Sequence, residues 1–414
     1  MILVYVFFPG CFLFSQTGTN RSIHIDSICI EKNWISWNRI IMKEVAFRQG
    51  DWVSKGMIDT AIHKIWNIGN FATVKYRIDT LPGNRNLLRI TAKDAFNIIP
   101  IFSPHGSGKD FTLDLGIMDG NFLGSNLKLM FKYKYGSNSK DILITFNIPR
   151  QLLYKNMTID GAYMMGGSQY YRYNDKEKIS GIGYSYKTAY ITIGNPFRED
   201  YSFEFAPSLT MTWLQESTDS SMIEKGLPTL DYKVNYMSFS IGEAVGTINY
   251  KRHQRDGLTL YLNAGVSLGL DDQSKSYGSL TFGGEYDKLF NRWLQFTGIF
   301  SSGTTTAELP SLLYYKGAYD VKGILTGQIS GRSYYTLYLG AHFTYLNKEW
   351  IAAEQSLYFN FGNGNDKYSH LFTTKPVYSV GTGFRIYSPM VPWMIILFYI
   401  SYSPVSSNWY YLGL

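Results

Sequence analysis

Few residues in the chain combine the type and the spacing that catalysis or metal binding requires. Ser168 lies in the segment MGGSQ, which lacks the Gly-x-Ser-x-Gly spacing and the strand-turn-helix context of a hydrolase nucleophile. The six histidines are dispersed along the chain, and none occurs in the His-Glu-x-x-His spacing of a zinc site. We therefore predict that the protein is not an enzyme and that it has no catalytic residues, metal site or cofactor.

The two cysteines bear on export rather than on chemistry. Residues 1–16, MILVYVFFPGCFLFSQ, contain an apolar run of signal-peptide length, and Ser15 offers a small residue for cleavage. Pro9 makes the residues around Cys11 a poor lipoprotein box. Removal of residues 1–16 leaves Cys29 as a lone thiol, which forms no internal disulfide. The sequence thus predicts an exported protein with neither a disulfide scaffold nor a cysteine metal site.

The chain is basic, with a formal net charge of +7 and an isoelectric point near 9.0. A basic protein can bind nucleic acid, but here the basic residues occur singly between aromatic residues, with no run of five or more. For an exported protein, this distribution favours contact with anionic lipid headgroups. We therefore expect no nucleic-acid partner.

The elements that must position any functional residue are predicted to be mainly strands. Aromatic residues make up 17% of the chain and charged residues 17%, and 39 residues are glycine, which is typical of many strands joined by tight turns. In LKLMFKYKY, every second residue is apolar or aromatic: Leu127, Leu129, Phe131, Tyr133 and Tyr135. Similar alternation recurs through residues 97–414, so each strand has one apolar face.

Two architectures fit this alternation. A soluble sandwich buries the apolar face in a core, whereas a membrane barrel turns it toward lipid. The segments run for nine or more residues, the length of a tilted membrane strand, whereas soluble strands cluster near about five or six residues. We therefore favour a transmembrane β-barrel over residues 97–414. At roughly 20 residues per strand and connection, this region predicts about 16 antiparallel strands.

Residues 21–95 have a mixed pattern that predicts a small α+β domain. RSIHIDSICI alternates as a strand does, whereas residues 33–47 and 53–71 show helical spacing. FATVKYRI and NLLRITAKD then form a hairpin around DTLPGNR. The predicted order of elements is β-α-α-β-β.

The ends of the two helices have candidate capping residues. Asn33 or Ser36 could cap the first helix, and Ser54 is the expected N-cap of the second. Gly69 is expected to end the second helix, because glycine adopts the left-handed conformation found there.

The order of these segments resembles the BamA/TamA outer-membrane assembly superfamily, also called bacterial surface antigen proteins. FRQGD and IWNIGNFATV are similar to the pattern of one polypeptide-transport-associated (POTRA) domain, at Gly50, Asp51, Asn67, Gly69 and Phe71. Residues 118–129 resemble the family's opening barrel hairpin, and residues 379–403 resemble its penultimate region. The resemblance implies a signal peptide (1–16), a POTRA domain (21–95) and an outer-membrane barrel (97–414).

In this family, a Val-Arg-Gly-Phe/Tyr motif on a long loop folds into the barrel lumen, where its arginine meets acidic residues. The resemblance places Val321, Lys322, Gly323 and Ile324 at the motif positions, with lysine in place of arginine. Lysine lacks the bidentate fork that grips a carboxylate, and Asn360 stands where the family has an acid. A Lys322–Asn360 hydrogen bond could replace the charge contact, the contact could be absent, or Lys322 could be solvated in a surface loop.

The resemblance also implies a seam between the first and last barrel strands. The expected seam residues are Phe111, Leu113 and Leu115 on the first strand, and Trp409, Tyr411 and Gly413 on the last. NWYYLGL lacks the terminal aromatic residue of the family, so either the seam is unusually weak or the chain is clipped. A weak seam could open sideways and offer a strand edge to a client protein.

The implied function is insertion of client β-barrel proteins into the outer membrane, with the POTRA domain in the periplasm. The expected client-binding edge of that domain comprises Ala72, Val74, Tyr76 and Ile78. The expected partners are unfolded outer-membrane proteins, outer-membrane lipid and accessory envelope proteins. The alternative is a protein translocation pore or plugged channel of the same superfamily.

Overall fold

The computed structural model describes residues 22–413 with several gaps. The positions outside the described residues within that range are 32, 67, 108–109, 154–156, 175–176, 197–202, 219–230, 252–253, 318–320, 349–350, 389–390 and 406–409. The chain forms two compact units that divide between Phe96 and Asn97. The predicted signal peptide, residues 1–16, and the predicted seam residue Trp409 lie outside the described residues.

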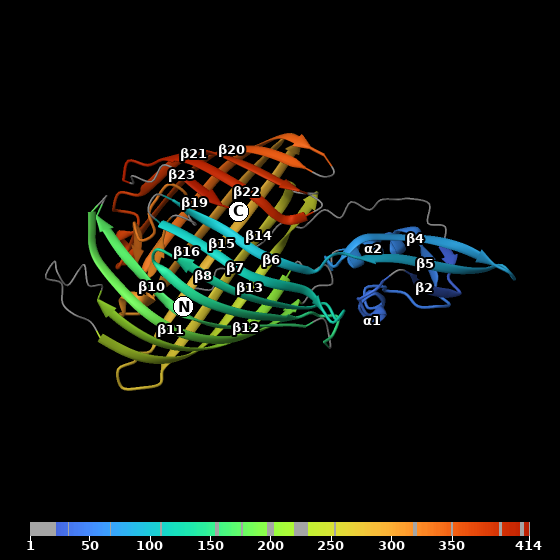
Figure 1. Cartoon of the computed structure of the whole chain (residues 1–414), viewed down its shortest axis with the longest axis horizontal. Coiled ribbons are helices and arrows are strands. Elements are labelled where there is room, and N and C mark those ends of the chain that lie inside the picture. The colour runs from blue at the N-terminus through green and yellow to red at the C-terminus, as the bar shows by residue number, and fades with distance from the viewer. Residues whose placement is uncertain are drawn as a thin grey trace. The chain divides into compact units, whose positions relative to one another are not determined.

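The N-terminal unit contains a three-stranded sheet, a two-stranded sheet and two helices (Figure 1). Its elements are β1 (Ser22–His24), β2 (Ser27–Glu31), α1 (Asn38–Met42), β3 (Trp52–Ser54), α2 (Lys55–Trp66), β4 (Phe71–Leu81) and β5 (Arg85–Asp94). β5 pairs in parallel with β2 and antiparallel with β4, so β4 lies at one edge of the three-stranded sheet. The predicted order of elements is present, and β1 and β3 form an additional two-stranded sheet.

The first helix is shorter than the prediction of residues 33–47. It begins after Trp37, without a side-chain cap, and ends at Met42. The carboxylate of Asp94 accepts hydrogen bonds from the backbone N–H groups of Trp34 and Ile35, at 2.6 and 2.8 Å. Because these N–H groups are held by a residue some 60 positions away, the chain turns there instead of continuing as a helix. The helical spacing of the sequence does not predict this contact.

The second helix begins and ends as predicted. The hydroxyl of Ser54 accepts a 3.3 Å hydrogen bond from the backbone N–H of Met57, and Gly69 has a φ of +82°. The helix buries Ile58 and Ile65 in a core that also contains residues of the sheet, such as Leu88. Among the described residues, no helix is both long and apolar enough to cross a membrane.

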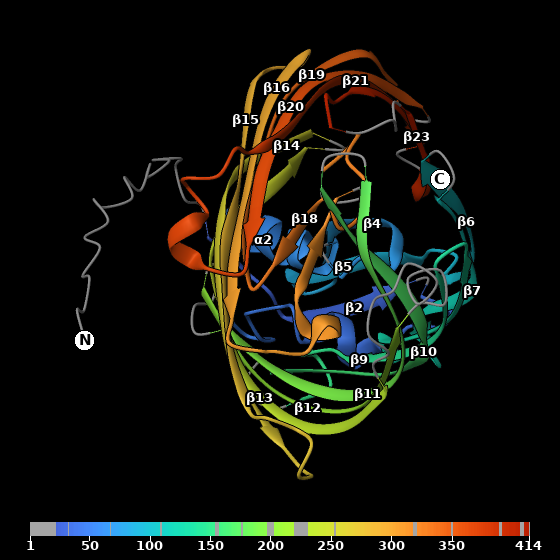
Figure 2. The same ribbon diagram turned by 90° about the vertical axis from the view of Figure 1, so that its left-hand side faces the viewer.

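The C-terminal unit is an antiparallel β-barrel (Figures 1 and 2). Its wall strands are β6 (Ile98–Ser107), β7 (Asp110–Phe122), β8 (Leu127–Gly136), β9 (Ser139–Ile148), β10 (Thr158–Asn174), β11 (Glu177–Pro196), β12 (Phe203–Thr218), β13 (Asp231–Lys251), β14 (Gln254–Gly269), β15 (Tyr277–Asn291), β16 (Leu294–Thr305), β19 (Ser333–Asn347), β20 (Ala352–Asn365), β21 (Val377–Ser388), β22 (Val391–Tyr402) and β23 (Tyr410–Gly413). Each wall strand pairs with its neighbours along the chain, β16 pairs with β19, and the ends of the sheet meet where β23 pairs with β6. The predicted antiparallel barrel is confirmed.

The alternation of the sequence separates an outer from an inner face of the wall. On β8, Phe131 and Tyr135 are 46% and 47% exposed, whereas Lys132 and Lys134 line an internal cavity. The ammonium of Lys132 donates to the carboxylate of Asp114 on β7 at 3.0 Å. Apolar side chains therefore cover the outside of the barrel, and polar side chains pair with one another inside it.

A segment between β16 and β19, described over residues 306–317 and 321–332, leaves the wall and enters the barrel; we call it the lumen segment. It contains a short helix, η2 (Pro310–Leu312), and a hairpin of β17 (Tyr314–Lys316) and β18 (Ile329–Gly331). Figure 2 shows β18 inside the ring of strands. The backbone N–H of Ser311 donates to Glu216 of β12, and Ser379 of β21 donates to the carbonyl of Lys322. Since β12 and β21 are far apart in the wall, the segment spans the lumen.

The core of the N-terminal unit provides a test of this packing. Ile58 is 1% exposed, whereas Met57, the preceding residue of the same helix, is 45% exposed. We expect Ile58→Ala to destabilise the unit by about 2–5 kcal/mol, because the substitution leaves a cavity. In limited proteolysis of the full chain, residues 22–96 should be cleaved faster while the barrel stays intact. Met57→Ala is the matched control, and equal cleavage of both variants would contradict the assigned core.

Candidate functional site in the barrel lumen

The residues Val321–Ile324 form a turn that lies against the barrel wall. Gly323 has a φ of +82°, in the left-handed region that favours glycine. A Cβ atom at this position would lie 2.4 Å from the Cβ of Ser401, so the wall leaves no room for a side chain. The hydroxyl of Ser379 donates a 2.6 Å hydrogen bond to the carbonyl of Lys322. Both the backbone conformation and the wall contact therefore require glycine at position 323.

Apolar burial fixes the turn inside the lumen. Val321 and Ile324 are 1% and 0% exposed and pack with Ile329 and Tyr334. Full burial of an aliphatic side chain of this size contributes about 1.5–3 kcal/mol. These contacts place the turn within the barrel and argue against a solvated surface loop at Lys322.

The ammonium of Lys322 faces three tyrosine rings, which we call the tyrosine cage. The Nζ atom lies 4.6 Å from the ring centroid of Tyr399, 4.8 Å from that of Tyr338 and 5.7 Å from that of Tyr358. All three distances are within the range of cation–π attraction. The rings come from β22, β19 and β20, so one side chain of the lumen segment is held by three wall strands.

Burial changes the acid–base behaviour of Lys322, which lies on the lumen segment and not on a wall strand. Removal from water lowers the pKa of its ammonium to about 8, and the positive charge of Arg385 acts in the same direction. An ammonium with this pKa is still mainly protonated at neutral pH. The charge that the tyrosine cage requires is therefore present under ordinary conditions.

Asn360, the predicted partner of Lys322, acts on the backbone of the turn instead of on the ammonium. It is 1% exposed, and its Nδ2 donates a 3.2 Å hydrogen bond to the hydroxyl of Ser379. That hydroxyl in turn donates to the carbonyl of Lys322. The proposed direct hydrogen bond is thus replaced by a relay through Ser379, while the rings of the tyrosine cage take the ammonium.

An ionic group lies on the wall beside the tyrosine cage. Glu354, which is 5% exposed, accepts a 2.8 Å hydrogen bond from Nδ1 of His342 and lies 3.6 Å from Nη1 of Arg385. Nε2 of His342 lies 3.5 Å from the hydroxyl of Tyr338. Glu354 is therefore a buried carboxylate near the tyrosine cage that is paired with wall residues.

Two cavities that are lined by described residues flank the lumen segment. The larger, of about 560 Å³, contains Lys322 and Lys316 of the segment, and we call it the lysine cavity. Its wall residues include Arg255, Tyr261, Thr297, Tyr338, His342, Arg385 and Tyr399. The smaller, of about 430 Å³, is lined by Ser311 and Leu312 of the segment and by residues of β8 to β12. The lumen segment thus divides the interior instead of filling it.

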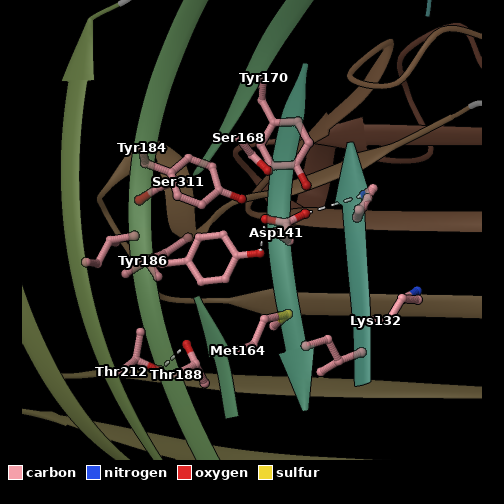
Figure 3. A pocket seen from close by; sticks show the side chains of 14 residues that line it. Lys132, Asp141, Met164, Ser168, Tyr170, Tyr184, Tyr186, Thr188, Thr212 and Ser311 are labelled. Atoms are coloured by element: carbon pink, nitrogen blue, oxygen red, sulfur yellow. Dashed lines mark hydrogen bonds and ion pairs between the residues drawn. The ribbon is translucent and has the colours of Figure 1, made fainter. Parts of the chain in front are cut away.

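Figure 3 shows the smaller cavity. The rings of Tyr170, Tyr184 and Tyr186 line one side, and the hydroxyl of Tyr186 donates a 2.6 Å hydrogen bond to Asp141. Lys134 lies 3.8 Å from the same carboxylate. Each charged side chain named for this cavity has a partner on the wall. The smaller cavity is also lined by fewer charged groups than the lysine cavity is.

The seam of the barrel differs from the prediction in its first strand. Phe111, Leu113 and Leu115 lie on β7, the second strand of the wall, and pair with β6 on one side. The strand that meets β23 is β6, through the pairs Leu412↔Gly106 and Gly413↔His105. The prediction of Phe111, Leu113 and Leu115 as seam residues was therefore wrong. Residues 118–129 comprise the end of β7, the connection at 123–126 and the start of β8. They therefore belong to the second hairpin of the barrel rather than to the first.

The last strand is placed as predicted for the residues that are described. Tyr411 pairs with Tyr399 of β22, and Gly413 pairs with Leu397 of β22 and with His105 of β6. Over the described residues, β23 and β6 share two residue pairs, whereas β6 and β7 share ten. The seam is accordingly the place where the wall has least backbone pairing.

The predicted client-binding edge lies on β4, at an edge of its sheet. Val74 is 7% exposed, and the hydroxyl of Tyr76 donates a 3.0 Å hydrogen bond to Asp59 of α2. Ala72 is exposed and lies at a register shift between Phe71 and Thr73, and Ile78 is half-buried. Val74 and Tyr76 therefore contact their own domain, and the strand offers its backbone edge, not a common side-chain surface.

Sequence reasoning missed the tyrosine cage and the ionic group around Glu354. The available signal was a tyrosine at an inward position of a wall strand, where alternation otherwise places small polar residues; Tyr338, Tyr358 and Tyr399 all stand at such positions. Within the described part of the chain, no group of three or more metal-binding side chains occurs.

Comparison with known proteins places this geometry in a structural context. No protein-family model and no curated protein sequence matches the chain. The crystal structure of BamA from Haemophilus ducreyi lacking POTRA domains 1–3 matches with a TM-score of 0.65 and 14% identity, over 96% of this chain and 85% of that one. The chain shares its fold with BamA. The expected BamA/TamA-type barrel is thereby confirmed at the level of the fold.

Two further structures have the same fold. CdiB from Acinetobacter baumannii matches with a TM-score of 0.63 and 11% identity, over 94% of this chain and 73% of that one. CdiB from Escherichia coli matches with a TM-score of 0.65 and 10% identity, over 94% and 76%. The architecture is therefore common to proteins with different names. The fold alone does not identify the activity of this chain.

The tyrosine cage can be tested by separating the ring from its hydroxyl. Tyr338→Leu removes one of the three rings and should weaken the hold on Lys322 by about 0.5–2 kcal/mol. In planar lipid bilayers, this loss should raise the frequency of current openings through the lumen by roughly two- to thirtyfold. Tyr338→Phe keeps the ring and should behave as the unchanged protein. Equal behaviour of the two variants would exclude a cation–π contribution.

Proposed function

We propose that the protein is an outer-membrane assembly factor, with a POTRA domain at residues 21–95 and a barrel of sixteen strands at residues 97–414. The barrel fold shared with BamA supports this proposal, and the apolar outer face of the wall is suited to a lipid environment. In this function the barrel inserts client β-barrel proteins by pairing with their strands at the seam. No covalent chemistry is involved.

The observation that carries the proposal is the weak seam between β6 and β23. Within lipid, each unpaired backbone group costs several kcal/mol, so a complete barrel wall resists opening. Over the described residues, the seam has two residue pairs and the other side of β6 has ten, so the seam is the boundary expected to separate at least cost. Separation exposes a strand edge, which can pair with another strand without demands on its side chains.

Two prolines weaken the seam further. Pro100 and Pro104 lie four residues apart on β6, so their backbone nitrogens face the same side of the strand. Neither nitrogen carries a hydrogen, so neither can donate a hydrogen bond on that side. Proline is tolerated in a sheet where this position faces away from a hydrogen-bonded ladder. The backbone N–H of Gly120 on β7 donates to the carbonyl of Asn97, so the odd-numbered residues of β6 direct their backbone groups to β7 and the even-numbered residues, both prolines included, direct theirs to the seam. The seam edge of β6 therefore offers fewer donors than an ordinary strand.

The N-terminal unit would supply a second strand edge for extended clients. β4 is eleven residues long and pairs only with β5 among the described residues, so one side of its backbone is available for β-augmentation. Outer-membrane barrel proteins contain many segments of alternating polar and apolar residues. While unfolded, such a segment can pair its backbone with the edge of β4 without sequence specificity. Such capture in the periplasm would concentrate clients before insertion.

A crosslink across the seam tests the proposal. Gly106→Cys and Leu412→Cys place two thiols on directly opposed residues. Oxidation should lock the seam and abolish insertion of a client barrel into liposomes, because no free edge can form. Activity should return on reduction.

The matched control is a crosslink within the permanent wall. Leu262 and Phe282 are opposed on β14 and β15, so Leu262→Cys with Phe282→Cys forms the same covalent bond away from the seam. This control should insert clients normally in both redox states. Undiminished insertion by the locked seam variant would refute the seam model.

The lumen segment favours a second candidate function, a translocation pore or plugged channel. The described residues of the lumen segment are held on opposite walls, at Ser311 by Glu216 and at Lys322 by Ser379. A segment held in this way blocks passage, and its release would open a path.

Deletion of residues 317–331 distinguishes the two functions. The deletion removes Lys322 and the apolar contacts of Val321 and Ile324, so we expect a large increase in conductance in planar bilayers. If client insertion persists in the deleted protein, the segment serves as a plug, and if insertion is lost, the segment serves assembly. A conductance equal to that of the unchanged protein would contradict the assignment of the segment to the lumen.

A further inference from the structure

The loop before α1, residues 34–37, turns its polar side chain inward and its apolar side chains outward; we call it the tryptophan loop. Ser36 is 5% exposed, whereas Trp34, Ile35 and Trp37 are 89%, 54% and 48% exposed. Single exposed apolar residues are common on protein surfaces. Three of them in one short loop, around a buried serine, indicate a surface that contacts something other than water.

Hydrogen bonds hold the tryptophan loop in one conformation. The carboxylate of Asp94 accepts hydrogen bonds from the backbone N–H groups of Trp34 and Ile35, at 2.6 and 2.8 Å. The same carboxylate accepts a hydrogen bond from the hydroxyl of Ser36, and the side-chain amide of Asn33 donates to the carbonyl of Ser36. The exposed side chains therefore project from a fixed backbone, so the loop would lose little conformational entropy when it binds.

The exposure of the loop favours insertion into lipid over the binding of a peptide. A side chain that is 89% exposed, as that of Trp34 is, has few neighbours, so it cannot form the wall of a groove that would hold a peptide. Insertion into a bilayer needs no groove. Tryptophan is enriched at membrane–water interfaces, because its large apolar ring can enter the lipid while its indole N–H stays hydrated.

The charge of the N-terminal unit and its connection to the barrel also favour lipid. Residues 21–96 contain twelve lysine and arginine residues against seven aspartate and glutamate residues, a balance that attracts anionic headgroups. Only three residues separate Asp94 from Ile98, the first residue of β6. Ile98 and Phe102 are 47% and 64% exposed and belong to the apolar outer face of the wall. A short stretch of chain thus joins the residue that holds the tryptophan loop to a strand whose outer face suits lipid.

From these residues, we infer that the tryptophan loop anchors the N-terminal unit in the interface of the lipid bilayer that surrounds the barrel. Trp34, Ile35 and Trp37 enter the boundary between headgroups and acyl chains, to a depth of about 5–10 Å. The anchor limits the motion of the unit relative to the bilayer. This inference rests on the proposed membrane location of the barrel, so its experiment must separate the failure of one from the failure of the other.

Nitroxide labels on single cysteines measure the depth of a residue in lipid. In the full chain with Cys11→Ser and Cys29→Ser, Ile35→Cys carries a label in the tryptophan loop and keeps both indole rings. The protein is placed in lipid nanodiscs that contain phosphatidylglycerol. The label should be accessible to oxygen, which dissolves in lipid, and protected from a water-soluble nickel chelate. The ratio of the two accessibilities should correspond to a depth of about 5–10 Å.

Pro82→Cys is the matched control on the same unit. Pro82 is exposed in the turn before β5, whereas Asp94 is the last residue of β5, so about 30 Å of extended strand separates the control from the tryptophan loop. The label at position 82 should be open to the nickel chelate. Trp34→Ser with Trp37→Ser should bring the label at position 35 to the same accessibility, because the loop loses the rings that hold it in lipid.

A label at Phe131→Cys, on the outer face of β8, tests the location of the barrel separately. If this label lies in lipid while the label at position 35 is open to the nickel chelate, the anchor is refuted and the membrane location stands. If neither label lies in lipid, both fail.

Three other results would also overturn the inference. Protection of the label at position 35 from both oxygen and nickel would show that protein covers the loop. Protection that appears only when an unfolded client is added would show a client-binding surface. An unchanged depth in the variant that lacks both tryptophans would show that the rings do not hold the loop in lipid.

Discussion

Backbone pairing around the wall is the constraint on which the rest of the structure depends. β13, for example, pairs with β12 over fifteen residues and with β14 over sixteen. A register that is fixed over such lengths also fixes which side chains point inward, because a slip of one residue would exchange the two faces. The outward apolar residues and the inward ion pairs, such as Lys132 with Asp114, follow from this register. Over the described residues, the pairing between neighbouring wall strands is shortest at the junction of β23 with β6, where it comprises two residues.

Inside the wall, the buried ammonium of Lys322 has no direct ion pair among the described residues. An unpaired charge in a protein interior is costly, and a buried ion pair often recovers little more than its own desolvation. Three tyrosine rings within 5.7 Å give the ammonium an attraction that needs no second charge. Asn360 is compatible with this arrangement, since an amide can bind Ser379 and support the carbonyl of Lys322. Relative to the motif that the sequence resembles, lysine in place of arginine and asparagine in place of an acid are therefore mutually compatible.

How far the sequence predicts the structure depends on how local the deciding contact is. Alternation within a strand is local, and it correctly placed residues such as Phe131 outside and Lys132 inside. β6 was missed because IIPIFSPHGS contains two prolines and lacks clean alternation, so the first strand was assigned to β7. The first helix was overextended because Asp94, far along the chain, holds the residues before it. The tyrosine cage joins β19, β20 and β22 to the lumen segment. The spacing of residues within a single strand cannot predict contacts between four separate elements.

The composition of β6 bears on how a templating edge could release its product. Alternate residues of a strand direct their backbone groups to the same side, so the seam edge of β6 comprises Ile98, Pro100, Phe102, Pro104 and Gly106. All five offer carbonyl acceptors, but the two prolines offer no donor. Each missing hydrogen bond reduces the hold on an incoming strand by about 0.5–1.5 kcal/mol. In a protein that inserts clients, an edge of this kind would pair well enough to guide the first client strand. This edge would still bind the first client strand less tightly than the client's own neighbouring strand binds it. Completion of the client barrel would therefore favour release of the client from β6.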